Sequence, residues 1–226
     1  MEFEKYLIRF NDSNLPENFV AIAAKIENQE VKHAAILIRH ESIDYLHHFP
    51  GATPPIVDDN FNENGWGVYK IIDSINVNDS DEVGSFLQYC RRICKKSNIT
   101  YSFIADCSSH ANNGEFISRI GLPELGTCVG FCLNTLANTI IDLEGTILHL
   151  DDWDDSGLTQ WIDDWATKQA QQKYPDLDWN LYNAFKKRIT PLEYLCAGFI
   201  DELPIRKEKI NQIIDSVQEV VNQKFP

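Results

Sequence analysis

Two neighbouring apolar segments constrain the fold of this 226-residue chain most strongly. The run HAAILIRH, residues 33–40, is almost continuously apolar, which is typical of a β-strand buried on both faces. SIDYLHHF, residues 42–49, alternates apolar and polar residues, and the polar RHES between the two runs fits a hairpin connection. The proline-rich PGATPP that follows ends the pairing, because proline cannot donate to a strand ladder. The sequence therefore predicts a β-hairpin over residues 33–49.

Other segments supply the partners of this hairpin. KYLIRF, residues 5–10, alternates Tyr6, Ile8 and Phe10 on one side, and GVYKIIDSINV, residues 67–77, reads as a further strand. Residues 79–96 change to a helical period, with acids at the start and bases at the end, as the helix dipole prefers. The 43% of hydrophobic residues is enough material for a substantial core.

These patterns predict an α+β fold in which an antiparallel strand group packs on helices. We expect a core over residues 1–140 and an acidic, mainly helical extension over residues 141–226, packed on that core. The second region holds most of the tryptophans and ends in an amphipathic helix with an apolar stripe of isoleucines and valines.

The charge and cysteine content exclude several classes of function. A net charge of −14 argues against binding nucleic acid or an anionic membrane, because both require a cationic surface. No apolar stretch reaches the roughly 20 residues of a membrane span, and no export signal is evident. Six scattered cysteines are then expected to be reduced thiols in the cytoplasm.

The stretch GTCVGFCLNTL, residues 126–136, predicts a helix that begins at a cysteine. Thr127 can cap its N-terminus, and Cys128 then takes the first helical position. Unpaired N–H groups and the helix dipole stabilise a thiolate there, so we expect a reactive Cys128 that is ionised near neutral pH. Cys132, one turn later on the same face, is expected to be a core residue.

A catalytic thiol also needs a base, and the predicted hairpin offers histidines. His33 opens the most apolar strand, which would hold its imidazole rigidly, and His47 and His48 lie on the following strand. Either of these two could orient the ring of His33. Cysteine, histidine and an orienting polar group are the components of a cysteine hydrolase.

The run HAAILIRHESIDYLHHFPG resembles the histidine strand and the next strand of the circularly permuted papain-like hydrolases, which include NlpC-like and lecithin:retinol acyltransferase-like proteins. CVGF at residues 128–131 is similar to the start of their nucleophile helix, and YSFIAD at residues 101–106 to the segment before it. The resemblance covers about residues 30–140. It implies a permuted papain-like core with Cys128 as nucleophile, His33 as base and His48, or one residue out of register His47, as the third residue.

The same resemblance implies a thiol hydrolase or acyltransferase that acts on an amide, isopeptide or ester bond of a peptide, protein or acyl substrate. We expect no cofactor and no metal. The oxyanion would meet the backbone N–H of Cys128 and a second donor that the sequence does not identify.

Four alternatives remain open at this stage. The paired cysteines of CRRIC and CVGFC, with Cys107 and His110, could form a zinc site of a small regulator. Cys107 and His110 are also a second candidate catalytic pair. The acidic segment 151–163 approaches the spacing of a calcium-binding loop. Finally, a papain-like fold could serve as a non-catalytic interaction module, with a protein partner bound by the acidic C-terminal region.

Overall fold

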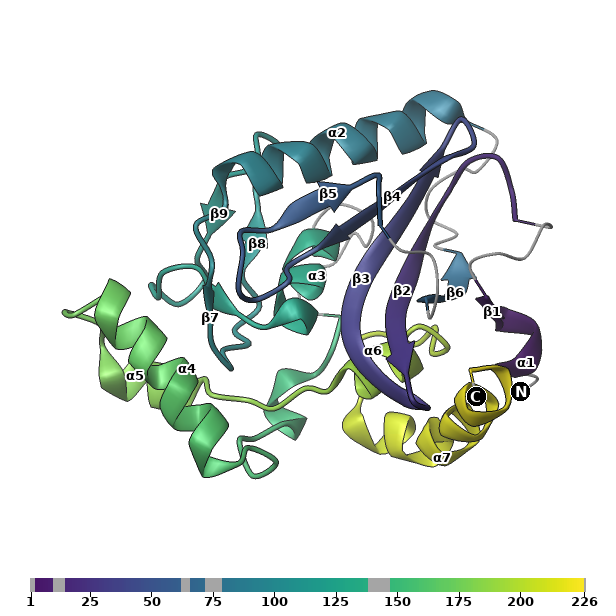
Figure 1. The fold of residues 1–226 in the computed structure, drawn as a ribbon. Helices are drawn as coiled ribbons and strands as arrows, with labels where there is room; N and C mark the ends of the chain where they lie inside the picture. The colour runs from purple at the N-terminus through teal and green to yellow at the C-terminus, as the bar shows by residue number, and fades with distance from the viewer. Residues whose placement is uncertain (1–2, 10–14, 62–65, 72–78, 138–146, 226) are drawn as a thin grey trace.

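A six-stranded antiparallel sheet forms the centre of the fold, with strand order β1-β6-β2-β3-β4-β5 (Figure 1). The computed structural model describes residues 3–9, 15–61, 66–71, 79–137 and 147–225. The strands are β1 (Leu7–Arg9), β2 (Phe19–Glu27), β3 (Glu30–His40), β4 (Ile43–His48), β5 (Ile56–Asp58) and β6 (Trp66–Ile71). The mixed α+β architecture predicted from the sequence is confirmed.

The predicted hairpin is formed by β3 and β4, whose register pairs Ile36 with His47. Its two turn residues, Glu41 and Ser42, have φ angles of 52° and 64°. Two positive φ angles match the twist of paired strands, although glycine and asparagine adopt them more easily. Hydrogen bonds from outside the hairpin hold this turn: the Glu41 N–H donates to Asn18 Oδ1, and the Ser42 N–H donates to the carbonyl of Glu17.

The sequence analysis missed β2, which lies between β3 and β6. β2 pairs with β3 along nearly its whole length, from Phe19 opposite Arg39 to Glu27 opposite Glu30. Its alanines, at positions 21, 23 and 24, are all fully buried. Alanine has low strand propensity, so the local pattern of β2 is weak, and burial between two neighbouring strands overrides it.

The N-terminal prediction was wrong in detail. Residues 5–10 were expected to form one strand with Tyr6 and Ile8 on the same side, but α1 (Phe3–Tyr6) precedes the short β1. Leu7 is the fully buried residue of this strand, and Tyr6 is 51% exposed. Phe10 and residues 72–77 of the expected strand 67–77 lie outside the described residues.

Helices cover one face of the sheet. They are α2 (Ser80–Lys96), α3 (Cys128–Leu136), α6 (Pro191–Ala197) and α7 (Lys207–Lys224), and their apolar side chains join those of β3 in one large core cluster. A smaller cluster on the other face contains Leu37 and Trp66. The short strands β7 (Thr100–Tyr101), β8 (Ser109–His110), β9 (Phe116–Ile117) and β10 (Leu125–Gly126), with a 3₁₀ turn at Leu150–Asp152, connect these helices.

The C-terminal region contains the expected helices, and part of it belongs to the main core. Figure 1 shows α4 (Gln160–Lys173) and α5 (Trp179–Ala184) together at one end of the molecule, while α6 and α7 lie against the sheet. Tyr194 of α6 is buried, and its hydroxyl donates to the carbonyl of Ala35 on β3. The predicted boundary at residues 140–141 lies outside the described residues. Among the described helices, none has the length and apolarity that crossing a membrane requires.

Glu193 fixes the start of α6 and leads to a stability prediction. Its carboxylate accepts hydrogen bonds from the Trp153 indole and from the Thr190 backbone N–H, while the Thr190 hydroxyl caps the Glu193 N–H. Glu193→Ala should lower the free energy of unfolding by about 1–3 kcal/mol, because the buried indole donor loses its partner. Urea denaturation measures this change. The exposed Glu219→Ala is the control, and an equal effect of both substitutions would contradict the prediction.

Candidate active site

Cys128 occupies the first position of α3, as the sequence predicts. The Thr127 hydroxyl accepts a hydrogen bond from the Gly130 N–H at 3.2 Å, which is the expected N-terminal cap. The Cys128 side chain is 8% exposed and receives backbone hydrogen bonds from Val129 and from Ala34 of β3. β4 pairs with β3 only as far as Ile36, so the N–H of Ala34 is available to the thiol. The nucleophile candidate therefore sits directly beside the residue that follows His33.

The ionisation of Cys128 differs from the expectation. Burial raises the pKa of the thiol above its ordinary value, and this effect outweighs the backbone hydrogen bonds and the nearby charge of Arg188, which lower it. Burial therefore disfavours the thiolate that the sequence predicts near neutral pH.

His33 and His48 form a hydrogen-bonded pair. His33 Nε2 lies 2.9 Å from His48 Nδ1, and the two rings meet edge to face, each 6.2 Å from the ring of Trp66. Burial, and then the neighbouring His48, lower the pKa of His33 to about 4. Burial also lowers the pKa of His48, against the charge of Asp58, which raises it. Both rings are thus neutral at physiological pH, and the structure brings His48, rather than His47, to His33.

The thiol and the imidazole lie on either side of the start of β3. Ala34 and Cys128 belong to the core beneath the helices, whereas His33 contacts Trp66, which belongs to the cluster on the opposite face. Within the described residues, Cys128 and His33 are not joined by a hydrogen bond, and His33 Nδ1 has no hydrogen-bond partner. The two groups are adjacent in the fold through the peptide of Ala34, but not in contact.

His47 is a fully buried residue of the interface between the sheet and the helices. Its Nε2 lies 2.9 Å from the Thr135 hydroxyl of α3, and its Nδ1 lies 3.4 Å from the Cys94 thiol of α2. Because the Thr135 hydroxyl donates to the carbonyl of Phe131, it accepts from the Nε2–H of His47. Burial lowers the pKa of His47, so the ring stays neutral and joins three elements.

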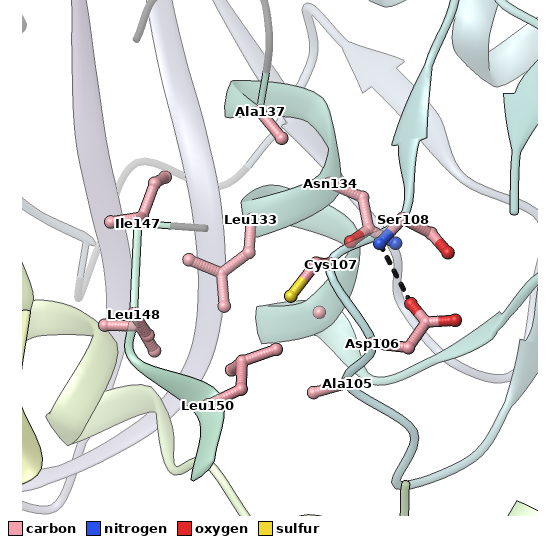
Figure 2. A pocket seen from close by; sticks show the side chains of 11 residues that line it. Ala105, Asp106, Cys107, Ser108, Leu133, Asn134, Ala137, Ile147, Leu148 and Leu150 are labelled. Carbon is pink, nitrogen blue, oxygen red and sulfur yellow. Dashed lines mark hydrogen bonds between the residues drawn. The ribbon is translucent and has the colours of Figure 1, made fainter. Parts of the chain in front are cut away.

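The second candidate pair, Cys107 and His110, is not assembled. Figure 2 shows Cys107 on the wall of a small pocket between residues 105–108, one side of α3 and residues 147–150. His110 instead lies 3.2 Å from Glu124 through its Nε2 and packs on the ring of Phe131. The carboxylate of Glu124 is held by Ser97 and Asn98 as well, so this histidine belongs to a buried hydrogen-bond network.

The described residues contain no group of three or more histidine, cysteine or acidic side chains placed to hold a metal ion. Cys90 and Cys132 are fully buried among apolar side chains, where desolvation raises the pKa of both thiols. In the acidic segment 151–163, Asp152 binds Arg206 and Asp163 binds Lys186. Asp154 accepts hydrogen bonds from Ser156, so these three acids of the calcium-like pattern each have a partner within the protein.

An open cleft of about 680 Å³ lies next to the candidate site. The loop 51–55, the segment 97–101 and α4 form its walls. Phe49, which follows His48, and Tyr101 line it, and the Tyr101 ring packs 5.2 Å from that of Trp165. Burial raises the pKa of Tyr101, with smaller effects of the Cys128 thiol, which raises it, and of Arg188, which lowers it. Tyr101 thereby links the cleft to the thiol.

Tyr101 and Arg188 were not among the site residues predicted from the sequence. Arg188 lies in the acidic region, far from Cys128 along the chain, and only the folded structure brings the two together. Comparison with known proteins adds no further assignment, because no family model, curated protein or solved structure matches this chain.

The His33–His48 pair predicts a specific dependence of stability on pH. Because the pKa of His33 is lower in the folded state than the ordinary value of 6.5, the unfolded chain binds a proton first as the pH falls. The stabilisation is complete above pH 6.5 and is lost as the pH falls toward about 4, an effect of roughly 3 kcal/mol. The His33→Asn variant should lack this part of the decline. Denaturation across this pH range measures the free energy of unfolding. Identical slopes of this free energy against pH for the wild-type protein and the variant would contradict the prediction.

Proposed function

We propose that this protein is a cysteine-dependent hydrolase or acyltransferase that cleaves an amide, isopeptide or ester bond through an acyl-enzyme on Cys128. The observation that carries the proposal is the position of the Cys128 thiol, at a capped helix N-terminus and against the N–H of Ala34, the residue after His33, whose imidazole a second histidine holds. The chain order His33, His48, Cys128 is that of a permuted papain-like core, and we propose that architecture for the sheet and α3.

The hydrogen bond between the histidines supports the assignment of His33 as the base. When His33 Nε2–H donates to His48 Nδ1, the lone pair of His33 lies on Nδ1, the atom without a partner. The Asp58 carboxylate near His48 favours this arrangement, because it stabilises positive charge on the pair. His48 is thus a positioning residue for His33. Hydrogen bonds of a catalytic pair are often long in the free enzyme and shorten in the substrate complex.

The reaction then proceeds in two transfers. Nδ1 of His33 takes the thiol proton, the sulfur attacks the substrate carbonyl carbon, and a tetrahedral oxyanion forms. The oxyanion collapses as the leaving group departs with the proton from His33, leaving a thioester on Cys128. Water, or an acyl acceptor, attacks the thioester and restores the thiol. The first N–H groups of α3 point to this site and stabilise the oxyanion.

Exposed tryptophans favour the alternative function, a non-catalytic interaction module. Trp161 and Trp165 of α4 are 72% and 42% exposed, and α4 also borders the cleft. Aromatic side chains of this kind are common at protein interfaces. In that case the chain would bind a protein through α4, and Cys128 would have no chemical role. The two functions make opposite predictions for the reaction of Cys128 with an activated ester.

An activated ester tests acyl-enzyme formation directly. p-Nitrophenyl acetate should release a burst of about one equivalent of p-nitrophenolate per chain, followed by slower turnover. Mass spectrometry should find the acetyl group on Cys128, and Cys128→Ala should abolish the burst. Cys107→Ala, at a more exposed thiol, is the control and should keep it. Acetylation of Cys107, or of several thiols equally, would contradict the assignment.

The role of His33 is tested by comparing two histidines of β3: His33 lies inside the strand, and His40 is its last residue. His33→Ala should slow the burst roughly 10²–10⁴-fold, which is the usual contribution of a positioned general base. His40→Ala is the matched control, because His40 lies at the far end of the strand and bonds Ser80. Its burst rate should stay within about threefold of the wild-type rate. Thermal melts of both variants confirm that they are folded, and a folded His33→Ala protein with the wild-type burst rate would remove His33 from the mechanism.

A further inference from the structure

We propose that Arg188 binds a carboxylate of the substrate beside the Cys128 thiol, so that the preferred acyl substrate is anionic. This inference rests on the proposed function and deepens it, because it names the charge of the substrate. Arg188 lies outside the segment 30–140 that suggests a hydrolase, and only the fold places it at the site.

Backbone contacts fix Arg188 next to the segment that leads to α3. The Lys187 N–H donates to the carbonyl of Phe103, and the Ser102 N–H on the same segment donates to the carbonyl of Gly126, two residues before Cys128. The Arg188 guanidinium carbon lies 5.5 Å from the centre of the Phe103 ring. Phe103 in turn packs against Tyr101, which lines the cleft. The charge of Arg188 is thereby held near the thiol, where it acts on both Cys128 and Tyr101.

The guanidinium has no anionic partner within the described residues. The acids of the segment 154–163, which adjoins Arg188, have other partners. Asp154 contributes only its carbonyl to the Arg188 N–H, since its carboxylate accepts from Ser156. Asp155 and Asp163 both lie within ion-pair distance of Lys186. A half-buried cation that the protein leaves without a counter-ion is suited to an external anion.

The acidic surroundings make this arrangement selective. The net charge of the protein repels anions, so binding one requires a local cation with an open hydrogen-bonding face. Arginine presents a planar fork that matches a carboxylate, and the carbon of this guanidinium lies over the Phe103 ring. Gly157 leaves room for the Arg188 stem, because a Cβ at that position would lie 3.3 Å from its Cγ. An acyl group that also carries a carboxylate matches the charge of this site.

Two alkylating reagents of nearly equal size test the proposal without knowledge of the natural substrate. Iodoacetate carries a carboxylate and iodoacetamide is neutral, and both alkylate a thiolate by displacing iodide. The measured quantity is the ratio of their rate constants at Cys128, read by peptide mass spectrometry. Any effect of Arg188 on the ionisation of the thiol cancels in this ratio, because it changes both rate constants by the same factor. Arg188→Gln should lower the ratio roughly tenfold, and added salt should lower it in the wild-type protein.

The controls separate this inference from the proposed function. Arg119→Gln removes the same charge at an exposed position and should leave the ratio unchanged. Gly157→Ala, which crowds the Arg188 stem, should lower the ratio while the charge is retained.

If Cys128 forms the acyl-enzyme but the ratio is the same in wild-type and Arg188→Gln proteins, the carboxylate site is refuted and the hydrolase stands. If Cys128 forms no acyl-enzyme with the ester, the proposed function fails, whatever the ratio. Circular dichroism of each variant verifies folding, and Arg188→Lys, which keeps the charge, should retain part of the preference if Arg188→Gln is unfolded.

Discussion

The fully buried imidazole of His47 fixes the relation between the sheet and the two helices that form the site. It donates to Thr135 of α3 and accepts from Cys94 of α2, so one side chain sets the position of both helices against β4. A buried donor or acceptor without a partner costs about 1–3 kcal/mol, which makes any sliding of α3 unfavourable. The place of the Cys128 thiol at the N-terminus of α3 follows from this contact, because the helix has only nine residues.

The same tight packing opposes the chemistry. Burial raises the pKa of the thiol and lowers the pKa of His33, so the ion pair of a thiolate and an imidazolium is disfavoured in the free protein. Three features favour the charged forms: the backbone N–H groups at the thiol and the charge of Arg188 stabilise the thiolate, and the Asp58 charge stabilises a protonated His48. A substrate that excludes water strengthens each of them, because charges interact more strongly when the surroundings are less polar. Reactivity would then depend on occupancy of the site.

The sequence predicted those parts of the structure that depend on strong local patterns. The strand pair β3–β4 and the capped start of α3 follow from an apolar run, an alternating run and a Gly-Thr step. The alanine-rich β2 has no such pattern and is a strand because its neighbours bury it. The contact between His33 and His48 could be foreseen from the pairing of their strands, but the choice between His47 and His48 required the register. The position of Arg188 depends on tertiary contacts of the acidic region and could not be predicted.

The acidic region is therefore part of the candidate site, and not only a layer around it. Tyr194 ties α6 to the carbonyl of Ala35, one residue from the peptide that contacts the thiol. The segment carrying Arg188 pairs with residues 103–105, which lead from the cleft toward α3. Several cations of this region are paired with acids, as Arg206 is with Asp152 and Lys186 with Asp163. Arg188, whose guanidinium has only the Phe103 ring as a described partner, then stands out as a local positive charge in a negative protein. Because the surrounding charge is negative, Arg188 attracts an anion only at close range. The site therefore selects an anionic group that contacts the guanidinium and does not draw anions from a distance.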